Sequence, residues 1–342
     1  MEYMRIPGWN GLEDDEPQPF EDILDMVYAN GTIFDAFVKA RSVLQQHPLP
    51  VASVSGGSDC DIMVDMLHRL DSTHKIRYVW FDTGLEYEAS KEHLDWMEGR
   101  YNIHIDRIKA AKSIPHCVHD YGQPFISKLA SEFIDSLQCN GFRWENKPLD
   151  ELMRMYPDMP PSSLKWWTND NTYNSNCVKY NKYLKEFMTE HPPTFKISSK
   201  CCTYAKKRTA KHIEGATADG ADLRIIGTRK AEGGVRSGIN TCYTSNKGKN
   251  IYRPLFWFKE QDKRDYERIF GITHSACYTL YGLKRTGCVG CPFNRNCAEE
   301  LDVISQFEPK LYRIAKEIFK DSYEYTRQYR EFCAEMRKKN ET

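Results

Sequence analysis

Short apolar runs alternate with helical patterns along most of the chain. Runs rich in β-branched residues at 51–54, 76–81, 103–108 and 222–227 have the length and composition of buried strands. Between them, apolar residues recur three and four positions apart, which places them on one face of a helix. Strands that alternate with helices predict an α/β fold with a doubly wound, mainly parallel sheet. We expect five strands, with helices on both faces of the sheet.

The same pattern predicts how the chain is organised. Residues 1–19 lack periodicity and contain an acidic run before two prolines, so we expect an acidic flexible arm. Two helical patterns predict an N-terminal helical cap over 20–49, and the strand-rich part predicts a main domain over 50–236. The C-terminal region, 237–342, contains a Cys-x-x-Cys turn and two terminal helices.

Residues 140–177 interrupt the main domain with prolines, asparagines and tryptophans, which predicts an insertion or lid. Trp166 and Trp167 stand beside Lys165, and exposed aromatic rings near a cation can stack on nucleobases. Burial of these rings against the main domain is the alternative, and it is the more common fate of tryptophan.

Composition and charge narrow the classes of function. The chain has 342 residues, and its 48 lysines and arginines balance 48 aspartates and glutamates. This balance predicts no general attraction to nucleic acid or to a membrane surface. No apolar run approaches a membrane span, and the polar, acidic start is unlike a signal peptide. We therefore expect a cytoplasmic protein, whose twelve cysteines serve metal or redox chemistry rather than disulfides.

A tight turn of Ser55, Gly56, Gly57 and Ser58 joins the strand at 51–54 to the next helix. The two glycines let the backbone approach a ligand closely. The free N–H groups and the dipole of a helix N-terminus attract phosphate oxygens. An ordinary strand-to-helix turn is the alternative, but the glycine pair between serines favours a phosphate site. The spacing matches neither the G-x-x-x-x-G-K-[ST] loop nor the G-x-G-x-x-G loop.

With Asp59, this turn resembles the S-G-G-x-D signature of the ATP pyrophosphatase (PP-loop) superfamily. Most of the chain over 50–295 is similar to the phosphoadenosine phosphosulfate (PAPS) reductase-like family within it. The resemblance implies that 50–236 is a nucleotide-binding PP-loop domain. It also implies that Ser55, Gly56, Gly57 and Ser58 hold the pyrophosphate part of ATP, and that Asp59 contacts Mg²⁺ or the ribose.

Asp82, Thr83 and Gly84 follow the second predicted strand, and parallel sheets bind ligands beyond the carboxyl ends of their strands. An aspartate here could also cap the next helix. The resemblance favours the ligand role, because a D-T-G turn at this place contacts the nucleotide in the superfamily. Lys128 follows a G-x-P-F segment that also occurs in PAPS reductase-like proteins, which implies a phosphate contact; a solvated lysine is the alternative.

Arg229 and Arg236 belong to a basic run and lie beyond the fourth predicted strand, where an anion is expected. Arginine suits two-point contact with phosphate. The segment resembles the family's G-x-R-x-x-E-x-x-x-R pattern, which implies closure over phosphates or sulfate. The predicted catalytic residues are Asp59 and these two arginines. The arginines position the phosphates and neutralise the charge that develops on them.

Four cysteines form a second constellation, with Cys201 and Cys202 adjacent and Cys288 and Cys291 in a Cys-x-x-Cys turn. Four thiolates suit a [4Fe-4S] cluster or a structural Zn²⁺ ion. Adjacent cysteines are awkward for tetrahedral zinc, and the pattern resembles the cluster-binding cysteines of the adenylyl-sulfate (APS) reductase branch, so we expect the cluster. Substitutes for one of the four, if needed, are Cys242, Cys277 and Cys297.

The predicted function is ATP-dependent cleavage between the α- and β-phosphates, which activates an acceptor for sulfur transfer. DNA backbone, a tRNA base and a small molecule remain open as acceptors, with the basic run and the tryptophans favouring nucleic acid; a sulfur donor protein would be a further partner. One alternative is sulfonucleotide reduction of PAPS or APS, although the family's C-terminal nucleophilic cysteine motif is absent around Cys333. The other is a non-catalytic nucleotide-sensing subunit of a larger complex.

Overall fold

The structure, a computed structural model, describes residues 18–170, 177–210, 220–246 and 249–341. Nearly all of the predicted acidic arm, and part of the predicted insertion, therefore lie outside the described residues. The chain forms two compact units. The first unit comprises Met1–Trp80, Glu92–Asp106 and Thr217–Ser275, and the second comprises Phe81–Lys91, Arg107–Ala216 and Ala276–Thr342.

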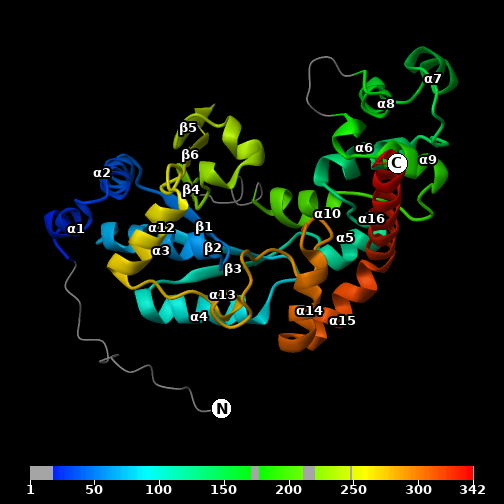
Figure 1. The fold of residues 1–342 in the computed structure, drawn as a ribbon. Helices are drawn as coiled ribbons and strands as arrows, with labels where there is room; N and C mark the ends of the chain where they lie inside the picture. Colours follow the sequence, from blue (N-terminus) through cyan, green and yellow to red (C-terminus); the bar gives the residue numbers. More distant parts are fainter. Residues whose placement is uncertain (1–17, 171–176, 211–219, 247–248, 342) are drawn as a thin grey trace. The chain divides into compact units, whose positions relative to one another are not determined.

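Within the described residues, the sheet has six strands in the order β3-β2-β1-β4-β6-β5. β1 pairs in parallel with β2 and β4, and β4 pairs in parallel with β6 (Figure 1). β5 and β6 form an antiparallel hairpin. The strands are β1 (Pro50–Val54), β2 (Arg77–Asp82), β3 (Ile105–Lys109), β4 (Leu223–Ile226), β5 (Tyr243–Asn246) and β6 (Lys249–Tyr252). The predicted α/β class and mainly parallel sheet are confirmed, with six strands instead of five.

The core of the first unit lies between the sheet and a layer of helices. Ala52 and Val54 of β1 and Tyr78 and Trp80 of β2 point to this layer, because alternate residues of a strand share one face. Val79, on the opposite face, is buried as well, so both faces of the central strands are covered. The helices are α1 (Phe20–Val27), α2 (Gly31–Gln46), α3 (Ser58–Leu70), α4 (Glu88–Tyr101, which begins in the second unit) and α12 (Glu260–Phe270).

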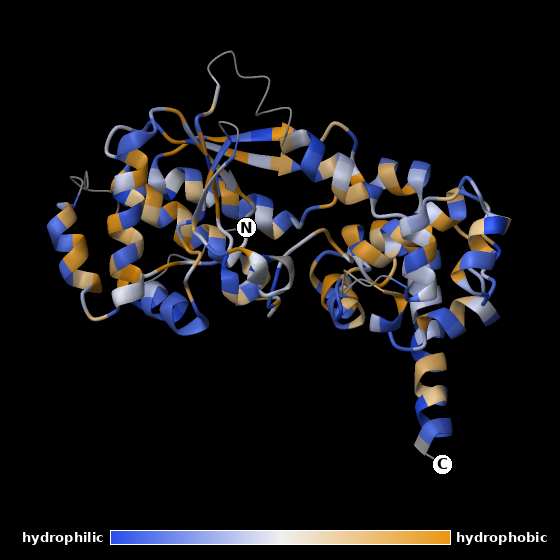
Figure 2. Ribbon diagram, turned by 90° about the horizontal axis from the view of Figure 1, so that it is seen from above, coloured by the Kyte–Doolittle hydropathy of each residue, from blue (hydrophilic) through white to orange (hydrophobic). Residues whose placement is uncertain are grey.

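The second unit is mainly helical and has two apolar clusters. Its helices alternate apolar and polar residues along their turns (Figure 2). They are α5 (Ile114–Tyr121), α6 (Lys128–Cys139), α7 (Leu149–Met155), α8 (Pro161–Thr168), α9 (Leu184–Glu190), α10 (Lys200–Cys202), α13 (Ala276–Thr279), α14 (Cys297–Phe307), α15 (Pro309–Ile318) and α16 (Lys320–Glu341). Short turns add η1 (Val178–Tyr180) and the π-helical η2 (Thr203–Arg208) here, and η3 (Lys230–Glu232) and η4 (Gly234–Gly238) in the first unit.

The tryptophans of the predicted insertion are core residues of the second unit. Trp166 and Trp167 on α8 are almost completely buried, and Trp144 packs against Trp167. The Trp167 indole donates to the Glu145 carbonyl at 2.9 Å, which satisfies its polar atom. The exposed stacking role considered for these rings is therefore wrong. In the described parts of the chain, no helix is long and apolar enough to cross a membrane.

Candidate functional site

The turn after β1 leaves the N-terminus of α3 open to a ligand. Gly56 has φ +66°, a conformation that favours glycine. Gly57 is the N-cap residue of α3 and, having no side chain, leaves the first N–H groups of the helix without a side-chain cap. Ser55 turns its hydroxyl to the Cys60 thiol at 3.0 Å. The predicted phosphate loop thus has the backbone geometry that an anion site needs.

Two basic side chains from distant parts of the sequence converge on Asp59 in the first turn of α3. Arg229 donates from Nε to Oδ2 of Asp59 at 2.9 Å. Lys263 of α12 donates from Nζ to Oδ1 at 3.0 Å and also to the Ser58 hydroxyl. Both cations are mostly buried. The loop is therefore flanked by a guanidinium and an ammonium group that share one carboxylate.

Glu260 at the start of α12 accepts a second hydrogen bond from Arg229, at 2.8 Å. Burial would lower the pKa of Arg229, but the hydrogen bonds that it donates to Asp59 and Glu260 outweigh burial and raise the pKa. Arg236 of η4 is more exposed and pairs with Glu232 at 3.2 Å. Of the two predicted arginines, Arg229 is thus held rigidly beside the loop, whereas Arg236 keeps a solvent-facing guanidinium.

A buried network of charged side chains is centred on Asp61, which lies on α3 close to the loop. Both carboxylate oxygens of Asp61 face imidazoles, with His93 Nε2 at 3.0 Å and His274 Nδ1 at 2.7 Å. His274 Nε2 contacts Glu267 at 2.9 Å, and Glu267 lies 3.9 Å from the Lys263 ammonium. The network links α3 to α12 and so fixes the helix that carries Lys263.

Lys263, His93 and His274 were not predicted from the sequence. Lys263 lies on a predicted helix whose local pattern is that of a solvated surface, with charged residues before and after it. No local spacing signals that its ammonium group reaches Ser58, 205 positions away. Only the packing of α12 against α3 could have identified it.

Replacement of His274 by glutamine should reduce stability in a pH-dependent way. Burial would lower the pKa of His274, but bonds to Asp61 and Glu267 raise it to about 9 from 6.5. Because the folded pKa is higher, the charged imidazole stabilises the fold fully below pH 6.5, and this stabilisation is lost as pH rises through 9. The Tm difference between wild type and His274→Gln should therefore be largest at pH 6 and smallest at pH 10. A difference independent of pH would contradict a charged His274.

In the second unit, the Asp82–Gly84 turn is built from its own polar atoms. The Asp82 carboxylate accepts from the Gly84 N–H at 2.9 Å, and the Thr83 hydroxyl donates to Glu86. The Thr83 carbonyl accepts from the Ile114 N–H at 2.8 Å, which ties the turn to α5. One oxygen of the Asp82 carboxylate is therefore used to shape the turn. A helix-capping role would use the carboxylate in a similar way.

The four predicted cysteines lie in one neighbourhood of the second unit. Cys201 shares a hydrogen bond with Cys202 and is influenced electrostatically by Cys288 and Cys291. That bond, together with nearby lysines, lowers the pKa of Cys202 to about 6 against the opposing effect of burial. Burial raises the pKa of Cys288 to about 11, although Lys206 acts against it. The lysines near Cys202 are Lys128, Lys206 and Lys207.

The Cys-x-x-Cys turn is fixed by a buried glutamate. Glu300 on α14 accepts from the Gly290 N–H at 3.3 Å and from Tyr87 and Asn294. Gly290 has φ +61°, and a Cβ there would lie 2.7 Å from the Tyr323 hydroxyl, so only glycine fits. Cys297 lies 3.7 Å from the Gly290 carbonyl and is the spare cysteine nearest this turn along the chain.

The chemistry of the donor set fits a thiolate-ligated group with neighbouring cations. Among the described side chains, however, no three Cys, His, Asp or Glu are arranged to hold a single metal ion. A single zinc ion would draw its sulfurs to within roughly 4 Å of one another, since each Zn–S bond is about 2.3 Å. A [4Fe-4S] cluster spreads four thiolates over four iron atoms and does not require that arrangement.

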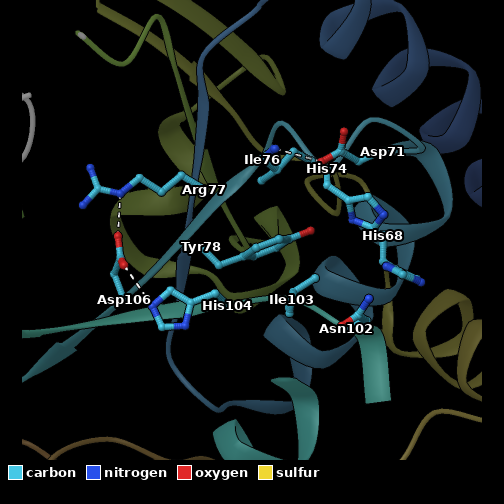
Figure 3. Close-up of a pocket in the computed structure, with 10 residues that line it drawn as sticks. All are labelled: His68, Asp71, His74, Ile76, Arg77, Tyr78, Asn102, Ile103, His104 and Asp106. Atoms are coloured by element: carbon cyan, nitrogen blue, oxygen red, sulfur yellow. Dashed lines mark hydrogen bonds and ion pairs between the residues drawn. The ribbon is translucent and has the colours of Figure 1, made fainter. Parts of the chain in front are cut away.

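A cavity of about 280 Å³ lies in the first unit where β2 begins, at the opposite end of that strand from the loop edge. Figure 3 shows Arg77 and His104 both directed at Asp106, at 2.5 and 3.4 Å. Asp71 accepts from the Ile76 N–H at 2.8 Å and so is used in shaping the chain. Because its carboxylates are engaged and it lies away from the loop, we assign this cavity no role in the phosphate site.

No protein-family model matches the chain, and no curated protein matches it. Among solved structures, it is similar to a phosphoadenylyl-sulfate (PAPS) reductase from Candida auris in complex with phosphate. The identity is 12%, the TM-score is 0.40, and 82% of this chain and 98% of that one are covered. It is also similar to an NH3-dependent NAD synthetase from Campylobacter jejuni subsp. jejuni, with 10% identity, a TM-score of 0.36, and 91% and 96% covered.

Proposed function

We propose that this protein binds the phosphates of ATP, or of a related adenine nucleotide, at the loop of Ser55, Gly56, Gly57 and Ser58. One observation carries the proposal: an uncapped helix N-terminus after two glycines lies beside the buried cations Arg229 and Lys263. Backbone N–H groups and the helix dipole then act on the same anion, next to the two cations that Asp59 holds in place. The proposed phosphate site uses residues of the first unit only.

The proposed reaction is transfer of the adenylyl group to an acceptor. An acceptor oxygen, whose proton is released to solvent, forms a bond to the α-phosphorus, the bond from this phosphorus to the α,β-bridging oxygen breaks, and pyrophosphate leaves with the electron pair. The loop and Arg236 hold the leaving pyrophosphate, while Arg229 neutralises the charge that grows on it. Because both oxygens of Asp59 are paired with cations, we assign Asp59 the task of positioning Arg229 and Lys263.

The proposal includes a [4Fe-4S] cluster held by Cys201, Cys202, Cys288 and Cys291, with Zn²⁺ as the alternative. Such a cluster supplies redox or sulfur chemistry when it is bound. The lysines around Cys202 favour thiolates and offset the negative charge of four of them. Metal analysis after anaerobic purification tests this: iron and sulfide with a brown chromophore are expected, and stoichiometric zinc would overturn it.

Measurement of pyrophosphate release from ATP tests the reaction. Release that depends on Mg²⁺ and on an acceptor is the expected result. Tight ATP binding without turnover, for every acceptor class tried, would favour the nucleotide-sensing subunit. Sulfite release from PAPS or APS would instead favour sulfonucleotide reduction. As acceptor we propose nucleic acid. This proposal depends on the basic run alone, because Trp166 and Trp167 are buried and cannot stack on bases.

Arg236→Ala should weaken binding of ATP by about 10- to 150-fold while adenosine binding stays unchanged. A charge-assisted contact to phosphate is worth about 1.5–3 kcal/mol, and adenosine has no phosphate. Stability should change little, since Arg236 pairs only at the surface. Arg229→Ala should weaken ATP binding similarly and also lower the Tm, because Arg229 is buried on Asp59.

Titration of ATP and of adenosine by calorimetry measures these effects. The matched control is Arg264→Ala on α12, which removes an exposed arginine bonded to Gln261 and should bind ATP as wild type does. Equal losses for ATP and adenosine in Arg236→Ala would show that the arginine maintains the structure instead of contacting phosphate.

A further inference from the structure

A second buried arginine stands at the same edge of the sheet as the phosphate loop. Arg253 directly follows β6, the loop directly follows β1, and Arg229 lies three residues after the end of β4. These three strands are parallel and adjacent, so their carboxyl ends share one edge (Figure 1). Neighbouring strands lie about 4.8 Å apart, which places the end of β6 roughly 10 Å from the end of β1.

Arg253 differs from Arg229 in its partners. Both are 7% exposed, but Arg229 has Asp59 and Glu260 as counter-ions. Among the described residues, no acidic side chain pairs with Arg253, and its buried Nε has no hydrogen-bond partner. Its only side-chain hydrogen bond there is a long one, from a terminal nitrogen to the Thr244 hydroxyl at 3.4 Å. Arg253 is therefore a buried cation with most of its donors unused.

Such an arrangement is costly for a folded protein. An uncompensated buried charge loses its hydration, and each unsatisfied donor adds a further penalty. Burial also lowers the pKa of Arg253. A hydrophobic residue of similar length would avoid both costs. An anion from outside the chain would supply the missing counter-charge.

We propose that Arg253, with the Thr244 hydroxyl, forms a second oxyanion site that binds a phosphate or sulfate group. A tetrahedral oxyanion offers enough acceptor oxygens for the free guanidinium donors and the hydroxyl together. This site lies too far from the loop to bind the same anionic group as the loop. It would bind a second anionic group, which belongs to the acceptor or to the part of the nucleotide farthest from the loop. The site does not rest on the proposed adenylyl transfer and is tested without ATP.

The experiment measures how inorganic phosphate stabilises the full-length protein. It is done in the Gly57→Asp background, where a carboxylate blocks the loop. We expect phosphate to raise the Tm of Gly57→Asp, and the added Arg253→Met substitution to raise the apparent Kd for phosphate at least tenfold. In phosphate-free buffer, Arg253→Met should raise the Tm, because it removes an uncompensated buried charge. Arg264→Met is the matched control and should alter neither value.

Two further measurements sharpen the result. Thr244→Val keeps the guanidinium and should weaken phosphate binding by several-fold without lowering the Tm. Inorganic sulfate should stabilise as phosphate does, whereas equal stabilisation by acetate at the same ionic strength would show general screening and overturn the site. A lower Tm of phosphate-free Arg253→Met, or its failure to fold, would show that Arg253 serves the fold and would equally overturn the proposal. Retained ATP binding in Gly57→Asp would disprove the loop site alone.

Discussion

Gly57→Asp should reduce the affinity for ATP by at least about 100-fold while the protein stays folded. Gly57 has φ −92° and ψ 154°, which aspartate adopts without strain, and it is the N-cap residue of α3. Aspartate is among the best N-cap residues, so the helix should form at least as well as before. The new carboxylate occupies the N–H groups that phosphate would use and repels it. Such a loss corresponds to roughly 2.7 kcal/mol.

Gly57→Asn separates charge from size, since asparagine caps a helix as well as aspartate but carries no charge. We expect Gly57→Asn to bind ATP more weakly than wild type and clearly more tightly than Gly57→Asp. Calorimetric titration gives the affinities, and circular dichroism with thermal melting confirms the fold. Wild-type affinity in a folded Gly57→Asp protein would remove the loop from the nucleotide site.

Cys288→Ser should lose the brown chromophore and the bound iron, and should melt at a lower temperature than wild type. Serine is a poor ligand for iron, and Cys288 shares its neighbourhood with the other three thiols. About ninety residues separate Cys288 from Cys202. A shared cluster would close this long loop, which contributes a few kcal/mol to stability in the chain-entropy model. Iron and sulfide analysis and the visible spectrum measure the first effect, and thermal melting measures the second.

Cys333→Ser is the matched control and should change neither metal content nor Tm. Cys333 is on α16, where its thiol lies 3.5 Å from the Lys182 carbonyl. If instead Cys333 were needed for turnover and Cys288 were dispensable, sulfonucleotide reduction would replace sulfur transfer as the better proposal. If Cys201→Ser and Cys202→Ser both kept their metal, Cys297 would be the next ligand to test, because it lies beside the Gly290 carbonyl.

The structure corrects the sequence-based predictions where packing overrides local pattern. The pattern of residues 178–190 predicts one helix, but the segment divides into η1 and α9, because Tyr183 between them has φ +61°. The hairpin of β5 and β6 was not predicted, since most residues of its two short strands are polar and only partly buried or exposed. Trp166 and Trp167 appear in the sequence beside polar residues, yet they fill the core of the second unit.

The sequence alone determines those features that depend on neighbours along the chain. The Gly56–Gly57 turn between a strand and a helix, the alternation of strands and helices, and the Cys-x-x-Cys turn all follow from local backbone and side-chain preferences. Only the tertiary structure decides which distant side chains meet. Lys263 reaches Ser58, His274 reaches Asp61, and the buried Nε of Arg253 finds no hydrogen-bond partner among the described residues. Each depends on how α12, the segment that follows it or the hairpin packs in the first unit, because charges on separate elements interact through space and leave no periodic signal in the sequence.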